Sequence, residues 1–232
     1  MSARLRWGLF AAVFVGVLLA GLPLRLVLAA TGMPAPLAAS GASGTLWNGQ
    51  LHGVHWDRTA LGSVSLRLSP WHLALGEARL AAAGPRLAAT VLQGRRTGVE
   101  HARGDLDLAL SGLPLRLSLD NAAAVFDRDR CIAAGGALAI ELAGPGSAGM
   151  PAPVLHARPR CDGGRWLAEF SAAPVDGMPA MHATLHLDRR GQLALLARVE
   201  TADPALRLAL ASQGFETSGA GMSLRAEGRL WR

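Results

Sequence analysis

Apolar and polar residues alternate with a period of two along much of this 232-residue chain, and this pattern constrains the fold most. Successive side chains of a β-strand point to opposite faces, so the alternation is typical of strands with one buried face. Gly, Pro and Arg-Arg-Gly clusters separate the segments as turns. We predict an all-β antiparallel meander that forms a sandwich or a rolled sheet. The alternating segments are residues 64–69, 106–111, 113–119, 138–142, 185–188, 206–210 and 224–230, and the turn clusters are residues 84–85, 144–146, 163–164 and 189–191.

Intrinsic propensity points the other way, because Leu and Ala favour helices over strands. The alternation recurs in so many segments that we give it more weight. Residues 204–211 are the one place in this region where a helix is plausible, but they alternate as well and are counted with the strands.

The first 30 residues differ from the rest of the chain. Arg4 and Arg6 precede an uncharged run, residues 7–24, which as a helix would be about 27 Å long, close to the roughly 30 Å hydrocarbon layer of a bilayer. Arg25 interrupts the run, but its side chain can reach the headgroups while residues 26–30 extend the helix. The basic tail predicts a cytoplasmic N-terminus and an exported C-terminal domain.

These features predict a domain organisation with one membrane segment. We expect a cytoplasmic tail at residues 1–6, a transmembrane anchor at 7–30, a Pro/Gly/Ala/Ser-rich linker at 31–43 and a periplasmic β domain at 44–232. The alternative is a cleaved signal peptide, since residues 27–29 have the small-residue character of a processing site. The apolar run is longer than a typical secretory core, which favours the anchor.

Charge and cysteine content bound the function classes. All 23 basic residues are Arg, and the net charge of +6 falls to about +3, 20 Arg against 17 acidic residues, once Arg4, Arg6 and Arg25 are assigned to the anchor. This small surplus does not predict a nucleic-acid surface. Cys131 and Cys161 would be ordinary thiols in the cytosol, but in an exported domain they are a candidate disulfide.

No motif for catalysis or cofactor binding accompanies these features. His52 and His55, with Asp57 nearby, form the best metal candidate, but they lack a third spaced ligand and read as an exposed strand or turn. Asp57 and Arg58 have no nucleophile or base signature beside them. His182, Thr184, His186 and Asp188 occupy one register of a strand and read as its solvent face. G-x-S-x-G, P-loop and G-x-G-x-x-G motifs are absent, so we expect no enzyme, no metal and no cofactor.

Trp47, Trp56 and Trp71 lie close together in a chain with only 5% aromatic residues. Trp47 lies between glycines in the hexapeptide GTLWNG, residues 44–49. A large ring fills space that Ala and Leu leave open, so we expect these tryptophans to be core anchors, with the glycines turning the chain beside Trp47.

The same residues resemble a known family, type II secretion system protein N. The resemblance rests on Gly44, Thr45, Leu46, Trp47 and Gly49, followed by Trp56-Asp57 and the stretch LSPWHLALG at residues 68–76 that contains Trp71. Cys131 and Cys161, each followed by a Gly-Gly pair, resemble the paired cysteines of that family. The likeness is strongest over residues 1–80 and moderate over 125–172.

The resemblance implies an inner-membrane protein with a short cytoplasmic tail, one anchor and a β-rich periplasmic domain. It also implies an accessory role in exporting folded periplasmic proteins across the outer membrane, with other secretion-system components as partners and no small-molecule substrate. A periplasmic lipid or lipopolysaccharide carrier is the alternative, because apolar faces of a rolled sheet can line a groove for acyl chains. We expect the apolar face to be closed or covered by a partner, because the many alanines favour a thin, tight layer.

Overall fold

The computed structural model describes residues 3–32, 37–56, 59–110, 113–142, 154–172, 180–212, 214–219 and 221–229. Its helices are α1 (Ala3–Ala20), α2 (Leu24–Thr31), α3 (Pro70–Ala74) and α4 (Pro204–Ser212). Its strands are β1 (Leu37–Ala38), β2 (Gly41–Gly44), β3 (Gly49–Trp56), β4 (Thr59–Leu68), β5 (Glu77–Ala83), β6 (Leu87–Gly94), β7 (Arg96–Leu110), β8 (Leu113–Asp127), β9 (Arg130–Leu142), β10 (Val154–Ala157), β11 (Arg160–Asp162), β12 (Arg165–Ser171), β13 (Met181–Leu187), β14 (Gln192–Val199), β15 (Glu216–Ser218) and β16 (Gly221–Arg229).

The described strands form one antiparallel sheet, which confirms the all-β prediction. Its order is β1-β3-β4-β5-β6-β7-β8-β9-β10-β12-β13-β14-β16-β15, while β2 pairs with β3 and β11 pairs with β12. Neighbours in the sheet are mostly neighbours in sequence, so the chain meanders as the alternation predicted. In β13 the residues Ala183, Leu185 and Leu187 are buried, and His182, Thr184 and His186 occupy the opposite register.

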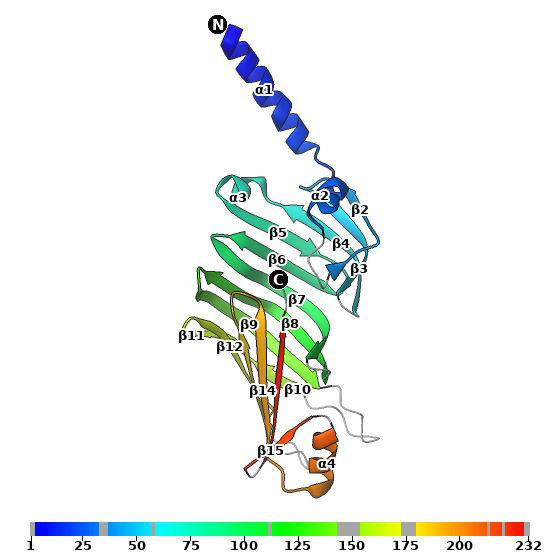
Figure 1. Cartoon of the computed structure of the whole chain (residues 1–232), viewed down its shortest axis with the longest axis vertical. Helices are drawn as coiled ribbons and strands as arrows, with labels where there is room; N and C mark the ends of the chain where they lie inside the picture. Colours follow the sequence, from blue (N-terminus) through cyan, green and yellow to red (C-terminus); the bar gives the residue numbers. More distant parts are fainter. Residues whose placement is uncertain are drawn as a thin grey trace.

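The sheet is rolled, so that its C-terminal strands cover its middle. In Figure 1 the orange and red strands β14 and β16 cross in front of the green strands β7 and β8. The apolar faces meet there in one large core cluster that includes Phe126, Ile140, Phe170, Leu195 and Ala226. Of the two predicted architectures, the rolled sheet is the one observed.

A second, smaller core cluster lies at the N-terminal end of the sheet. Leu51 and Val54 of β3 and Leu61 and Val64 of β4 are buried there beneath Leu24 of α2. Between the two clusters, the cross-strand pairs Leu68–Leu80, Leu80–Val91 and Val91–Val99 continue the same apolar face. These side chains are only half-buried, and Val91 is 39% exposed. We refer to Leu68, Leu80, Val91 and Val99 as the apolar row.

One segment expected to be a strand is a helix. Residues 204–212 form α4, at the end of the molecule opposite α1 (Figure 1). Pro204 stands at its first position, where a missing N–H costs nothing, and the Asp203 carboxylate accepts a hydrogen bond from the Ala205 N–H at 2.9 Å. These start signals, with the helix propensity of Leu and Ala, override the short alternation.

The N-terminal segment also differs from the single helix predicted. α1 ends at Ala20, and α2 begins after Pro23, whose ring interrupts the helix. α2 packs on the sheet through Leu24, which is 3% exposed, whereas α1 projects away from the sheet (Figure 1). β1 and β2 lie in the region that we expected to be a linker, residues 31–43, and β2 extends one residue beyond it to Gly44.

Within the described part of the chain, no helix combines the length and the apolar composition needed to cross a membrane. The transmembrane anchor therefore stays a prediction.

Candidate interaction surfaces

The hexapeptide GTLWNG forms the tight turn between β2 and β3. The Thr45 N–H donates to the Asn48 carbonyl at 3.1 Å, and the Asn48 N–H donates to the Thr45 hydroxyl at 3.3 Å. Gly44 has a φ of +79°, in the left-handed region that favours glycine, and a Cβ there would lie 2.6 Å from the Asn48 carbonyl oxygen. The turn therefore requires glycine at this position.

This turn also binds the chain segment between α1 and α2. The Leu46 N–H donates to the Leu22 carbonyl at 3.0 Å, and Pro23 forms a β-bridge with Thr45. A Cβ on Gly49 would meet Leu24 Cδ2 at 2.5 Å and the Thr45 carbonyl oxygen at 2.8 Å. We call residues 22–24 together with the GTLWNG turn the N-terminal joint, because it fixes the start of the sheet to the helices before it.

Trp47, Trp56 and Trp71 occupy different environments. Trp47 in the turn and Trp56 on β3 are half-buried, and Trp56 packs against the N-terminal core cluster. Trp71 on α3 is 81% exposed, so the expectation that it is a core anchor is wrong. A different tryptophan has that role. Trp166 of β12 is buried and its indole N–H donates to the Ala123 carbonyl at 2.9 Å.

The histidines do not gather into a site. His52 and His55 are exposed on β3, and the His52 ring is hydrogen-bonded to the Ser43 hydroxyl at 3.0 Å. Asp57 and Arg58 lie outside the described residues. Among the residues that are described, no group of three or more His, Cys, Asp or Glu side chains is placed to hold a metal ion.

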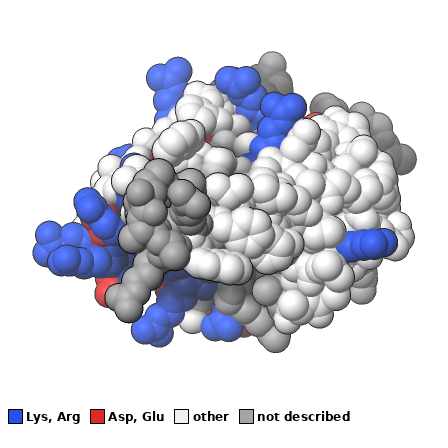
Figure 2. Space-filling view, turned by 90° about the horizontal axis from the view of Figure 1, so that it is seen from above, with Lys and Arg blue, Asp and Glu red and all other residues white. Residues whose placement is uncertain are grey.

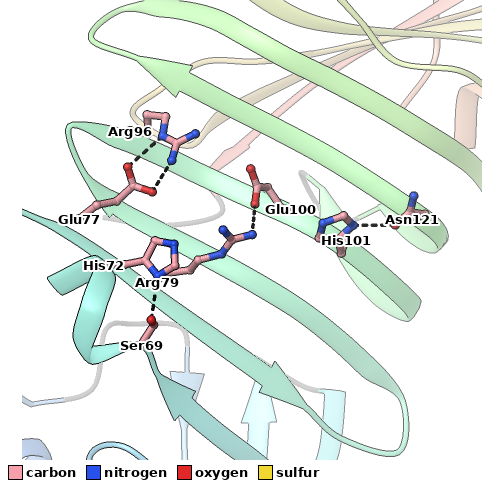
Figure 3. A network of polar contacts seen from close by, with 8 residues as sticks. All are labelled: Ser69, His72, Glu77, Arg79, Arg96, Glu100, His101 and Asn121. Atoms are coloured by element: carbon pink, nitrogen blue, oxygen red, sulfur yellow. Dashed lines mark hydrogen bonds and ion pairs between the residues drawn. The ribbon is translucent and has the colours of Figure 1, made fainter. Parts of the chain in front are cut away.

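Carboxylates on the outer face of the sheet are paired with arginines, and the two pairs described first join β5 to β7 across the intervening β6. Figure 3 shows Glu77 of β5 accepting two hydrogen bonds from Arg96, at 2.8 and 2.9 Å, and Arg79 donating to Glu100 at 2.8 Å. The same view shows His72 beside Ser69 and His101 beside Asn121. The hydrogen bonds from the Arg96 guanidinium lower the pKa of the Glu77 carboxyl, against the opposing effect of its burial.

Further along the sheet the same arrangement recurs. Asp107 lies between Arg86 and Arg116, at 3.3 and 3.0 Å, and Arg160 forms a two-bond pair with Glu169. In each pair the arginine compensates the charge of the carboxylate through charge-assisted hydrogen bonds. The outer face of the sheet therefore carries both positive and negative side chains, in agreement with the small net positive charge of the sequence.

Cys131 and Cys161 form a disulfide, with a Cα–Cα distance of 5.5 Å. The bond joins β9 to β11, and the Cys131 N–H donates to the Gly164 carbonyl at 2.7 Å. It thereby ties the small β11–β12 hairpin to the middle of the sheet. The candidate pairing of the two cysteines is confirmed in this structure.

Two features of these surfaces escaped the sequence reasoning. The joint partners Leu22 and Leu24 lie within the apolar run, where nothing distinguishes them from lipid-facing residues. The pairing of Glu77 with Arg96 depends on strand register, which places residues 19 apart side by side. Only Pro23, two residues after Gly21, signalled a break in the first helix. The alternation of β5 and β7 signalled that Glu77 and Arg96 face outward.

A family model described as type II secretion system (T2SS), protein N, matches residues 35–225. This range contains the GTLWNG turn, both cysteines and nearly all of the sheet. No curated protein and no solved structure matches the chain.

Proposed function

The chain belongs to the type II secretion system protein N family, and from this we propose that it supports export of folded proteins through protein–protein contacts within that system. The family match over residues 35–225 is the observation that carries the proposal. The mixed, arginine-paired outer face agrees with a binding role.

We further propose that α1 anchors the protein in the inner membrane and that the sheet lies in the periplasm. Arg4 and Arg6 stand at the start of α1, and Trp7, Phe10 and Phe14 are exposed on this helix, which projects away from the sheet. The basic start favours a cytoplasmic N-terminus. A disulfide between Cys131 and Cys161 suits an oxidising compartment such as the periplasm.

The apolar row is the surface we propose for contact with another secretion component. The edge strands β1 and β15 have two and three residues, so they offer few backbone groups to an added strand. The row instead presents half-buried leucine and valine side chains between the two core clusters. Apolar surface left open in this way is typical of a binding site.

Complementation of a deletion strain tests this function. Wild-type protein should restore the release of secreted proteins, whereas Val91→Glu should leave them in the periplasm. Leu196→Glu is the matched control, because Leu196 is 38% exposed but lies in the opposite register of β14, which faces outward. Normal secretion in the deletion strain would contradict the function, and normal secretion with Val91→Glu would contradict the contact surface.

The apolar row also favours a second candidate function, that of a lipid or lipopolysaccharide carrier. Acyl chains could cover the row where the rolled sheet leaves it open. Mass spectrometry of the full chain, gently extracted in detergent, separates the two functions. We expect no stoichiometric lipid, and one lipid per chain that is lost in Val91→Glu would favour the carrier.

A further inference from the structure

The short helix α3 carries large apolar side chains that the rest of the protein leaves uncovered. Trp71 and the adjoining Leu75 are 81% and 84% exposed, and Leu73 is 44% exposed. Hydrogen bonds fix the helix in place: the Ser69 N–H donates to the Arg79 carbonyl at 3.0 Å, and the Leu75 N–H donates to the Trp71 carbonyl at 3.3 Å. The apolar side chains are therefore held outward by an ordered segment.

α3 lies at the end of the molecule from which α1 leaves. In Figure 1 it stands level with α2, and α1 leans toward the side of the sheet that carries α3. Figure 2 looks onto this end, where most of the visible surface is free of charged side chains and the Arg side chains lie mainly toward the margin. If α1 is in a membrane, α3 is held close to the surface of that membrane.

The charges near α3 suit an anionic surface. Glu77 pairs with Gly94 across β5 and β6, which places the turn containing the exposed Arg95 next to the end of α3. The nearby carboxylates of Glu77 and Glu100 are paired with Arg96 and Arg79. α3 itself contains no acidic residue. A phospholipid headgroup layer thus meets apolar and basic side chains here rather than uncompensated acids.

We propose that α3 is a second membrane contact, with Trp71 and Leu75 inserted into the headgroup region of the bilayer that holds α1. Trp favours this layer because its ring is apolar and its N–H remains hydrogen-bonded to water or headgroups. The anchor supplies a high local concentration of lipid, so a small contact is sufficient. The contact rests on the proposed anchor and sets the tilt of the sheet on the membrane.

A fluorescent reporter at Leu75 tests the contact in the full chain. Leu75→Cys can be labelled with the environment-sensitive dye NBD without reductant, because both native cysteines are in the disulfide. Leu208→Cys is the matched control, since Leu208 is 76% exposed on α4 at the opposite end of the molecule. Both labelled proteins are reconstituted into vesicles of phosphatidylethanolamine and phosphatidylglycerol, with and without brominated acyl chains.

We expect the dye at position 75 to shift to the blue, to lose emission in brominated vesicles and to resist quenching by iodide. The dye at position 208 should show none of these changes. Equal emission shifts and equal quenching at positions 75 and 208 would overturn the contact. A dye at position 75 that is shielded from iodide but not quenched by brominated lipid would also overturn it, because that result indicates that protein covers the site. Extraction by alkaline carbonate is measured in parallel, because release of the whole chain would contradict the anchor, whereas a retained chain with a water-exposed position 75 contradicts the α3 contact alone.

Discussion

At the scale of single residues, the N-terminal joint depends on the absence of side chains. Gly44 and Gly49 allow the GTLWNG turn to close against its own backbone and against Leu24. Leu24 and Gly49 form a contact so close that one methyl group added at position 49 disrupts it.

Gly49→Ala should therefore destabilise the protein by about 1–3 kcal/mol, the usual range for overpacking a tight site. The added Cβ would lie 2.5 Å from Leu24 Cδ2 and 2.8 Å from a backbone oxygen. Gly41→Ala is the control, because a Cβ there meets nothing within 4 Å. Urea unfolding of both variants in the same detergent measures the difference, and equal midpoints would contradict the packing of the joint.

A second residue-scale prediction concerns the pH dependence that Glu77 contributes. The pKa of Glu77 is lowered in the folded state, so the unfolded chain binds more protons below the ordinary value of 4.5. The stabilisation is present above that value and is lost as the pH falls through the folded pKa. Glu77→Gln should lower the free energy of unfolding by about 1–2 kcal/mol at pH 7. This value allows for solvent screening of the ion pair, because the Arg96 side chain is 39% exposed.

The difference in unfolding free energy between wild type and Glu77→Gln should narrow below about pH 4. Glu227→Gln serves as the control, because the Glu227 carboxylate is well exposed and its pair with Arg225 is worth little. If the difference in unfolding free energy between wild type and Glu77→Gln stays constant from pH 7 to pH 3, the effect of the substitution is not due to the ion pair.

At the scale of elements, the disulfide decides how firmly the β11–β12 hairpin is attached. Cys131 and Cys161 are 30 residues apart, and the segment between them includes β10. Closing a loop of this length restricts the unfolded chain.

Replacing both cysteines with alanine should lower the unfolding free energy by about 3 kcal/mol on the chain-entropy account. Wild-type protein unfolded with a reductant should match the double variant, which separates the bond from the packing of the thiols. Thiol labelling of unreduced, unfolded wild type should find no reactive cysteine, and two reactive thiols would show that the bond is absent.

At the scale of the whole molecule, the apolar N-terminal helix and the rolled sheet project in different directions from one joint (Figure 1). The proposed topology places them in two phases, with α1 in the membrane and the sheet in the periplasm. The arginines before Trp7 are the feature from which we propose this orientation.

A reporter fused after Arg232 checks this topology. Alkaline phosphatase needs an oxidising compartment to form its disulfides, so it should be active in the fusion. A fluorescent protein that folds only in the cytoplasm should remain dark there. The opposite pair of results would place the sheet in the cytoplasm and would remove the proposed role.

The sequence by itself determined the antiparallel meander, because alternation along parts of β7, β8, β9 and β13 assigns each residue to a face without knowledge of its neighbours. It also determined the family, through the GTLWNG turn and the paired cysteines. It did not determine α4, where the cap at Asp203 outweighs the alternation. It also did not determine the exposure of Trp71, because an aromatic residue in the sequence looks the same whether it lies in a core or at an interface.

Only the tertiary structure decided how the sheet closes. Alternation is the same for a sandwich and for a rolled sheet, since both bury one face of each strand. The curvature that brings β16 over β7, and leaves the apolar row half-buried, arises from bulges and register shifts in β7 and β8. Contacts between residues far apart in the chain, such as Leu24 with Gly49 and Glu77 with Arg96, follow from that geometry and have no signature in local sequence.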